Sequence, residues 1–129
     1  METHSVKAAG LAAISGRRLL VVKKGNWWIL PGGKVEEGEN CLGCLAREVA
    51  EELPGAMIKV EKYYREFRGT TPISRKEIVV RVYLGSISGN FAPAAEITDF
   101  CWVDSNSSLN LSDITHDILA ALCHDDYIA

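Results

Sequence analysis

Residues 33–52, with the sequence GKVEEGENCLGCLAREVAEE, join a glycine-rich turn to a segment that carries three closely spaced carboxylates. Apolar residues recur here at helical spacing. Asn40 can cap the first turn, and the proline after Leu53 disfavours helical backbone at Leu53 itself. The pattern therefore predicts a helix from about Asn40 to Leu53, with one buried stripe formed by Leu42, Leu45, Val49 and Leu53.

The carboxylates of this helix, Glu48, Glu51 and Glu52, fall within one arc of its surface, because successive residues turn by about 100°. They repel one another, and the last two lie near the negative helix end, at a cost of roughly a few tenths of a kcal/mol per pair. A solvated acidic surface tolerates this, and a hard cation such as Mg2+ or Mn2+ removes it. The preceding Pro31-Gly32-Gly33 lets the backbone and a free carbonyl approach the helix, which favours a metal site.

The flanking sequence predicts strands on both sides of this helix and a second helix at the carboxyl end. Branched and aromatic residues are typical of strands, and turn residues separate the segments. Helical spacing returns over residues 111–123, with Ser112 as the expected cap. The order predicts one α/β domain, residues 1–129, with a sheet between helices. The expected strands are residues 6–13, 18–23, 27–30, 57–67, 76–87 and 97–103.

Composition limits the function classes. The chain has 129 residues, 47% hydrophobic and 24% charged, with a net charge of −3. This balance argues against a nucleic-acid polymer or a membrane surface as partner. No apolar stretch is long enough to span a membrane, and a signal peptide is not recognisable. We therefore expect a cytoplasmic protein whose four cysteines are reduced thiols.

Read together, residues 33–52 resemble the signature of the Nudix hydrolases, the MutT-like family. The family pattern is a glycine, five residues, a glutamate, seven residues, then Arg-Glu, an apolar residue, any residue, Glu-Glu, any residue, glycine and an apolar residue. Gly33, Glu39 and the run over residues 47–53 match in register. One position departs, because Pro54 stands at the second glycine and Gly55 follows it. The flanks at residues 28–36 and 96–103 are also similar.

The resemblance implies a Nudix-type α/β/α sandwich with a mixed sheet between helices. It also implies cleavage of a nucleoside diphosphate linked to another group. By position, Glu48, Glu51 and Glu52 would bind Mg2+ or Mn2+, with the Gly32 carbonyl as a further ligand. Such metals neutralise the anionic diphosphate and favour ionisation of the attacking water, which agrees with the chemistry required.

The same resemblance gives roles to three more residues. Arg47 would orient Glu48, and Glu39 would support Arg47 or the metal-bound waters. Glu96 would be one more acidic residue near the metals, although a residue before a strand is also ordinary surface. A carboxylate must accept the proton of the attacking water. Glu48, Glu52 and Glu96 all stay open for that role.

The substrate is expected to be a small-molecule nucleotide. A chain with little beyond the core fold most resembles the branch that hydrolyses ribonucleoside or deoxynucleoside triphosphates. ADP-ribose, nucleotide sugars and dinucleoside polyphosphates are the alternatives, and a homodimer stays open. Pro72 lies roughly where ADP-ribose enzymes carry a proline. The basic segment at residues 68–75 either reaches phosphates or forms a solvated hairpin tip.

Three other interpretations compete with a hydrolase. The C-x-x-C of Cys41 and Cys44 at a helix start is typical of redox proteins, where the helix dipole lowers a thiol pKa. A zinc site would need paired soft ligands, which His4, His116 and His124 do not provide. A non-catalytic nucleotide-binding module would be expected to have lost some of the motif. Trp27 and Trp28 are candidates for base stacking or for core packing.

Overall fold

The computed structural model describes residues 5–71 and 74–129. Pro72 and His4 therefore lie outside the described residues. The strands that precede the first helix are β1 (Val6–Ser15), β2 (Arg18–Lys24), β3 (Trp27–Ile29) and β4 (Gly32–Lys34). The remaining elements are α1 (Cys41–Glu52), β5 (Met57–Thr70), β6 (Glu77–Ser88), β7 (Ile97–Val103) and α2 (Asp113–His124).

Strand β1 is the centre of the sheet. Its first residues run antiparallel to β4 on one side and parallel to β6 on the other, and its last residues pair with β2. Strand β5 pairs antiparallel with β6, while β2 pairs antiparallel with both β3 and β7. The described strands therefore form one mixed sheet, as the family resemblance implies.

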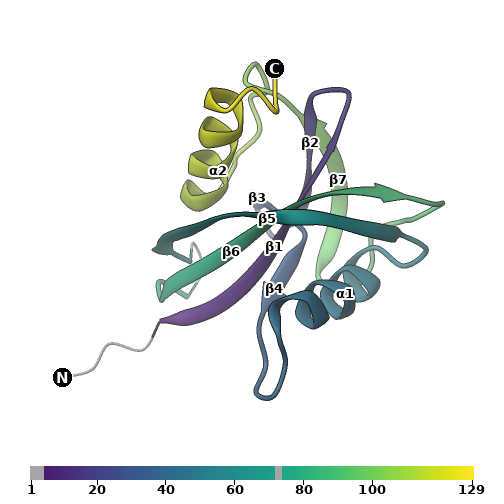
Figure 1. Ribbon diagram of the computed structural model, residues 1–129, viewed down its shortest axis with the longest axis vertical. Helices are drawn as coiled ribbons and strands as arrows, with labels where there is room; N and C mark the ends of the chain where they lie inside the picture. The colour runs from purple at the N-terminus through teal and green to yellow at the C-terminus, as the bar shows by residue number, and fades with distance from the viewer. Residues whose placement is uncertain (1–4, 72–73) are drawn as a thin grey trace.

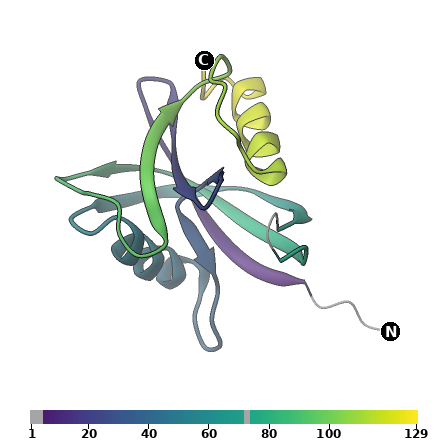
Figure 2. The same cartoon turned by 180° about the vertical axis from the view of Figure 1, so that it is seen from behind.

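The two helices cover opposite faces of this sheet (Figure 1). Side chains alternate across β1 because successive strand residues point to opposite faces. Ala8 and Ala12 pack in the cluster that contains the buried residues of α2. Ala9 and Leu11 pack in the cluster that contains the buried residues of α1. The reverse view shows the same arrangement (Figure 2), and the α/β/α fold class is confirmed.

Helix α1 begins and ends close to where the sequence predicts. The Asn40 side chain accepts a hydrogen bond from the Gly43 amide, so Asn40 is the cap. Leu45, Val49 and Leu53 are buried as expected. The expectation for Leu42 is wrong, because its side chain is 52% exposed. Leu42 lies at the edge of the arc formed by the buried residues of α1, which are Cys44, Leu45, Val49 and Glu52, so helical spacing alone does not bury it.

The turn after α1 accounts for the departure at Pro54. Residues 53–56 form a turn in which the Ala56 amide donates to the Leu53 carbonyl. Proline at the second position and glycine with φ +95° at the third are the residues that a type II turn requires. A Cβ on Gly55 would also lie 2.4 Å from the Asn90 carbonyl oxygen. Gly55 therefore supplies the glycine that this turn needs, one residue after the position of the glycine in the family pattern.

The strands differ from the expectation in two places. Strand β4 was not predicted, because Gly32, Gly33 and Lys34 have low strand propensity and pair only through their register with β1. The β5–β6 hairpin is longer than expected, so Arg68 belongs to β5 and not to a loop. In the described part of the chain, no helix has the length and apolar character needed to cross a membrane.

Candidate active site

The candidate site lies where the Gly32-Gly33 backbone of β4 meets the carboxylate side of α1. The Glu52 carboxylate accepts a hydrogen bond of 3.0 Å from the Gly32 amide. A Cβ on Gly33 would lie 2.6–2.9 Å from the Glu48 carboxylate atoms. Gly32 itself has φ +137°, and a Cβ there would lie 2.1 Å from the Ala9 carbonyl oxygen. Both glycines are therefore required for β4 to approach α1 and β1 this closely.

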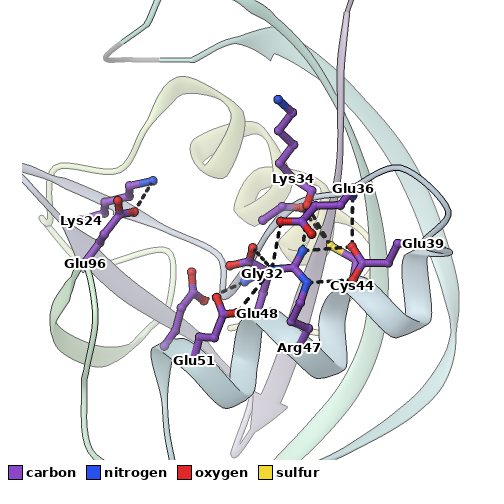
Figure 3. A network of polar contacts seen from close by, with 12 residues as sticks. Lys24, Gly32, Lys34, Glu36, Glu39, Cys44, Arg47, Glu48, Glu51 and Glu96 are labelled. Atoms are coloured by element: carbon purple, nitrogen blue, oxygen red, sulfur yellow. Dashed lines mark hydrogen bonds and ion pairs between the residues drawn. The ribbon is translucent and has the colours of Figure 1, made fainter.

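Arg47 joins the carboxylates on the same side of α1 (Figure 3). Its guanidinium donates two hydrogen bonds to Glu39, of 2.8 and 3.0 Å, and one of 2.8 Å to Glu48. A fourth bond of 3.1 Å reaches the Lys34 carbonyl oxygen. These charge-assisted bonds, with a smaller part from the Glu36 amide, hold the pKa of Glu39 down at about 2. The side chain of Arg47 is therefore held in one position against Glu48.

Glu51 completes the trio from a more exposed position. Its side chain is 54% exposed and lies 3.6 Å from the Arg47 guanidinium. Among the described residues, that guanidinium has four carboxylates within 4 Å, two on α1 and two, Glu36 and Glu39, on the loop before it. Figure 3 shows Glu48 and Glu51 leaving the same side of α1, next to Gly32. The structure thus brings together the residues that the sequence singles out, apart from Glu96.

Glu52 is the buried member of the trio. The pKa of its carboxyl is raised to about 8, chiefly by burial. The charges of Glu48 and Glu51 act in the same direction, while the Gly32 hydrogen bond and the Lys24 charge oppose it. Of the ion pairs within residues 5–71 and 74–129, none includes Glu52. A buried carboxylate with a raised pKa beside other carboxylates is typical of functional sites.

Glu96 stands apart from the trio. It precedes β7, its side chain is 75% exposed, and it forms a 3.0 Å ion pair with Lys24 at the end of β2. Figure 3 shows this pair to one side of Glu48 and Glu51. The charge of Lys24 acts to lower the pKa of Glu52, so Glu96 influences the trio only through this lysine. The motif and its spacing do not indicate Lys24. A basic residue at the end of a strand that faces the motif is the signal that could have indicated it.

The donor set fits a hard divalent cation. The side chains are carboxylates, the neighbouring backbone supplies carbonyl oxygens, and Gly33 leaves the space that Glu48 needs. In the part of the chain that the structure describes, no three His, Cys, Asp or Glu side chains are gathered into a preassembled metal site. The fit therefore rests on the donor chemistry, on the space that Gly33 leaves for Glu48 and on the buried carboxyl group of Glu52.

The C-x-x-C segment is not arranged for redox chemistry. Cys44 is fully buried, and its thiol donates weak hydrogen bonds to the Gly33 and Lys34 carbonyl oxygens. Burial, with the charge of Glu39, raises its pKa to about 11, whereas a reactive thiol needs a lowered pKa. Cys41 is a free thiol, and so is Cys44. The buried thiol instead fixes the backbone of β4 beside α1.

The remaining candidates have ordinary positions. His116 and His124 are exposed on α2. Trp28 is 8% exposed and belongs to the core cluster on the α2 face. Of the two interpretations of this residue, the structure supports core packing. Trp27 is partly exposed.

The fold and the site define a class of small α/β proteins in which a carboxylate-bearing helix packs against a glycine-rich strand. The NUDIX domain model matches residues 4–121, so the chain belongs to the NUDIX domain family. The prediction of a Nudix hydrolase, a pyrophosphohydrolase of phosphoric anhydride bonds, is confirmed at this level. Members of the family act on small nucleotide substrates and generally use a divalent metal.

Solved structures support the same fold. A MutT NUDIX hydrolase from Burkholderia pseudomallei has 23% identity and a TM-score of 0.76, over 91% of this chain and 97% of that one. A putative nudix hydrolase family member from Chromobacterium violaceum has 25% identity and a TM-score of 0.76, over 96% and 80%. A UDP-X diphosphatase has 21% identity and a TM-score of 0.78, over 98% and 66%. A comparison with curated protein sequences gives no match.

Proposed function

We propose that the protein is a single-domain Nudix hydrolase that cleaves ribonucleoside or deoxynucleoside triphosphates with Mg2+ or Mn2+. The observation that carries this proposal is the arrangement of Glu48, Glu51 and Glu52 around the Gly32-Gly33 backbone, with Arg47 held against Glu48. A triphosphate is the proposed substrate because the motif is of the MutT-like kind, and structures with the same fold include two MutT proteins. Structures with this fold also include a UDP-X diphosphatase and an ADP ribose pyrophosphatase, so nucleotide sugars and ADP-ribose are the alternatives.

The proposed metal ligands are the carboxylates of Glu48, Glu51 and Glu52 and the carbonyl oxygen of Gly32. When bound there, the cation would neutralise the substrate's phosphates and make water a better nucleophile at neutral pH. Arg47 orients Glu48 through its 2.8 Å hydrogen bond, and Glu39 fixes Arg47 from the other side. Glu39 and Arg47 are in this proposal positioning residues.

The reaction itself is a hydrolysis. The oxygen of a water attacks one phosphorus of the anhydride, and the bond from that phosphorus to the bridging oxygen breaks. One product leaves with the bridging oxygen, and a carboxylate of the site accepts the proton of the attacking water. Lys24, held by Glu96 beside the trio, supplies a positive charge that lowers the pKa of Glu52. Glu96 is thus proposed to act through Lys24.

The test is a panel of nucleotides incubated with Mg2+ or Mn2+, followed by identification of the products. Each reaction is run in water enriched in oxygen-18, because the labelled product reveals which phosphorus was attacked. Nucleoside monophosphate and pyrophosphate from a triphosphate are the expected products. Turnover of ADP-ribose or a nucleotide sugar alone would reject the triphosphate branch. No turnover of any member with either metal would reject the proposed activity and favour a binding module.

A further inference from the structure

Three cations share one face of the sheet beyond the amino-terminal end of α1. Val79 of β6 lies between Lys7 of β1 and Arg68 of β5. Two residues further along β6, Arg81 lies between Ala9 and Glu66. Neighbours across strands, and residues two apart on one strand, point to the same face of a sheet. Ala9 packs in the cluster beneath α1. Lys7, Arg68 and Arg81 therefore lie on the α1 face, in a part of the sheet that continues past the helix (Figure 1).

These cations line a groove of about 770 Å³, which is large enough for a small ligand. The sheet forms one wall. The loop before α1 and the first residues of that helix form the other wall, through Val35, Glu39, Asn40 and Cys41.

The charge of the groove is positive. Three cationic side chains line it against two carboxylates, those of Glu39 and Glu66. Glu39 is already bonded to Arg47, which lies outside the groove lining. Glu66 lies between Arg68 and Arg81 but at 3.5 and 4.0 Å, so neither pair is a close one. A groove with this excess of arginine and lysine is suited to phosphate oxygens.

The groove and the carboxylate site meet at Glu39. This residue lines the groove with one side and holds Arg47 with its oxygens, and Arg47 holds Glu48. Arg81 is also held in place, since its guanidinium lies 5.4 Å from the centre of the Tyr63 ring. An extended substrate at the carboxylates could therefore reach a cation that is already positioned.

We infer that this groove binds a phosphate-bearing end of the substrate, remote from the bond that is cleaved. The inference rests on the proposed function, and it narrows the substrate class to molecules with phosphate beyond the cleaved anhydride. The terminal phosphates of a triphosphate and a phosphorylated second group share this chemistry. A substrate that ends in an uncharged sugar lacks it.

The first experiment measures binding of inorganic tripolyphosphate to protein freed of metal on a chelating resin, by calorimetry at low salt. Arg81→Gln is expected to bind about tenfold more weakly, the loss typical of one charge-assisted hydrogen bond. Lys59→Gln removes the same charge from β5 outside the groove and is expected to bind like wild type. Glu66→Gln is expected to bind more tightly, because it removes the carboxylate that competes for Arg68 and Arg81.

The second experiment uses the thiol in the groove as a reporter. Cys41 lines the groove, whereas Cys101 and Cys123 lie elsewhere. Tripolyphosphate is expected to slow alkylation of Cys41 by N-ethylmaleimide, mapped by mass spectrometry, and to leave the other two unchanged. Adenosine, which carries no phosphate, is expected to protect none of them.

Equal affinities for wild type, Arg81→Gln and Lys59→Gln would overturn the inference, and so would a wild-type protein that does not bind tripolyphosphate. Protection of Cys41 by adenosine alone would assign the groove to the nucleoside instead.

Neither measurement needs turnover of a substrate. A nucleotide panel without products would therefore reject the proposed function and leave the binding result unaffected. Failure to bind tripolyphosphate would reject the groove and leave the proposed function unaffected. With an active enzyme, KM values of wild type and Arg81→Gln distinguish the two phosphate sources. A KM raised for triphosphates assigns the groove to the terminal phosphates. A KM raised only for substrates with a phosphorylated second group assigns it to that group.

Discussion

Helices α1 and α2 have the same length, 12 residues, and each has a side-chain cap, but only α2 follows the electrostatic preferences of a helix. Helix α2 has Asp113 in its first turn and His124 in its last, which complements the helix dipole. Helix α1 has no acidic residue in its first turn and ends on Glu51 and Glu52. The helix with the unfavourable charge distribution is the one whose side chains form the candidate site. This is expected where functional residues are kept at a cost to stability.

The sharpest way to break this comparison is to remove one acidic charge from each helix. Glu51→Gln is expected to lower turnover roughly 100-fold or more, since removing even the hydrogen-bond partner of a metal ligand costs about 10–100-fold. The fold should be unaffected, because the change relieves repulsion on an exposed side chain. Asp117→Asn, on the exposed side of α2, is the matched control. Steady-state kinetics and circular dichroism measure both, and unchanged turnover in Glu51→Gln would reject the metal assignment.

The next effect concerns stability in the presence of metal. A cation that binds only the folded protein stabilises it by about 2.7 kcal/mol at a concentration 100 times its Kd. Thermal unfolding with increasing Mg2+ or Mn2+ is therefore expected to shift upward for wild type and for Asp117→Asn. The shift should be much smaller for Glu51→Gln. An equal shift in all three proteins would show that the cation binds away from α1.

The capping residues of the two helices differ in their expected contribution to stability, and here the larger effect is expected for α2. Ser112 is buried and bonds both the amide and the hydroxyl of Thr115, whereas Asn40 is exposed and bonds one amide. Ser112→Ala is expected to cost about 2 kcal/mol of unfolding free energy and Asn40→Ala about 1 kcal/mol. Urea denaturation with an unchanged m value measures both. A larger loss for Asn40→Ala would mean that α1 contributes more to stability than its contacts indicate.

The smallest effect depends on pH and belongs to the α2 side. Burial, and then its hydrogen bond to Asp125 just after α2, raise the pKa of Tyr64 from 10 to about 12. Because the folded pKa is the higher one, this stabilisation is complete below pH 10 and is lost as the pH rises toward 12. Tyr64→Phe is expected to cost about 1 kcal/mol at pH 8 and progressively less above pH 10. Unfolding curves against pH measure this, with Tyr63→Phe as the control, and a pH-independent difference would contradict it.

Local patterns predicted the helices well, because a cap and a stripe are encoded by neighbouring residues. Asn40, Ser112 and the end of α1 at Leu53 are examples. The motif also predicted which residues gather at the carboxylate site, although their roles stay predictions. Strand β4 could not be predicted, because three residues of low strand propensity are ordered only by their register with β1.

The groove was missed for the same reason. Lys7, Arg68 and Arg81 are distant in sequence and become neighbours only through the pairing of β1, β6 and β5. The sequence predicts a loop at residues 68–75, whereas Arg68 belongs to β5. Lys7 and Arg81 are the single cations of β1 and β6, and neither segment indicates which strands pair.

The central position of β1 has a consequence for the order of folding. This strand is synthesised first, and its parallel partner β6 follows about 70 residues later, with Val6 opposite Ile78. At a synthesis rate of about 5–20 residues per second, β1 waits roughly 4–14 s for that partner. Pairings so distant in the chain also slow folding of the complete protein. The nascent chain therefore exposes an apolar strand while most of the domain is still being made, and it is in this interval that a chaperone would have the most to bind.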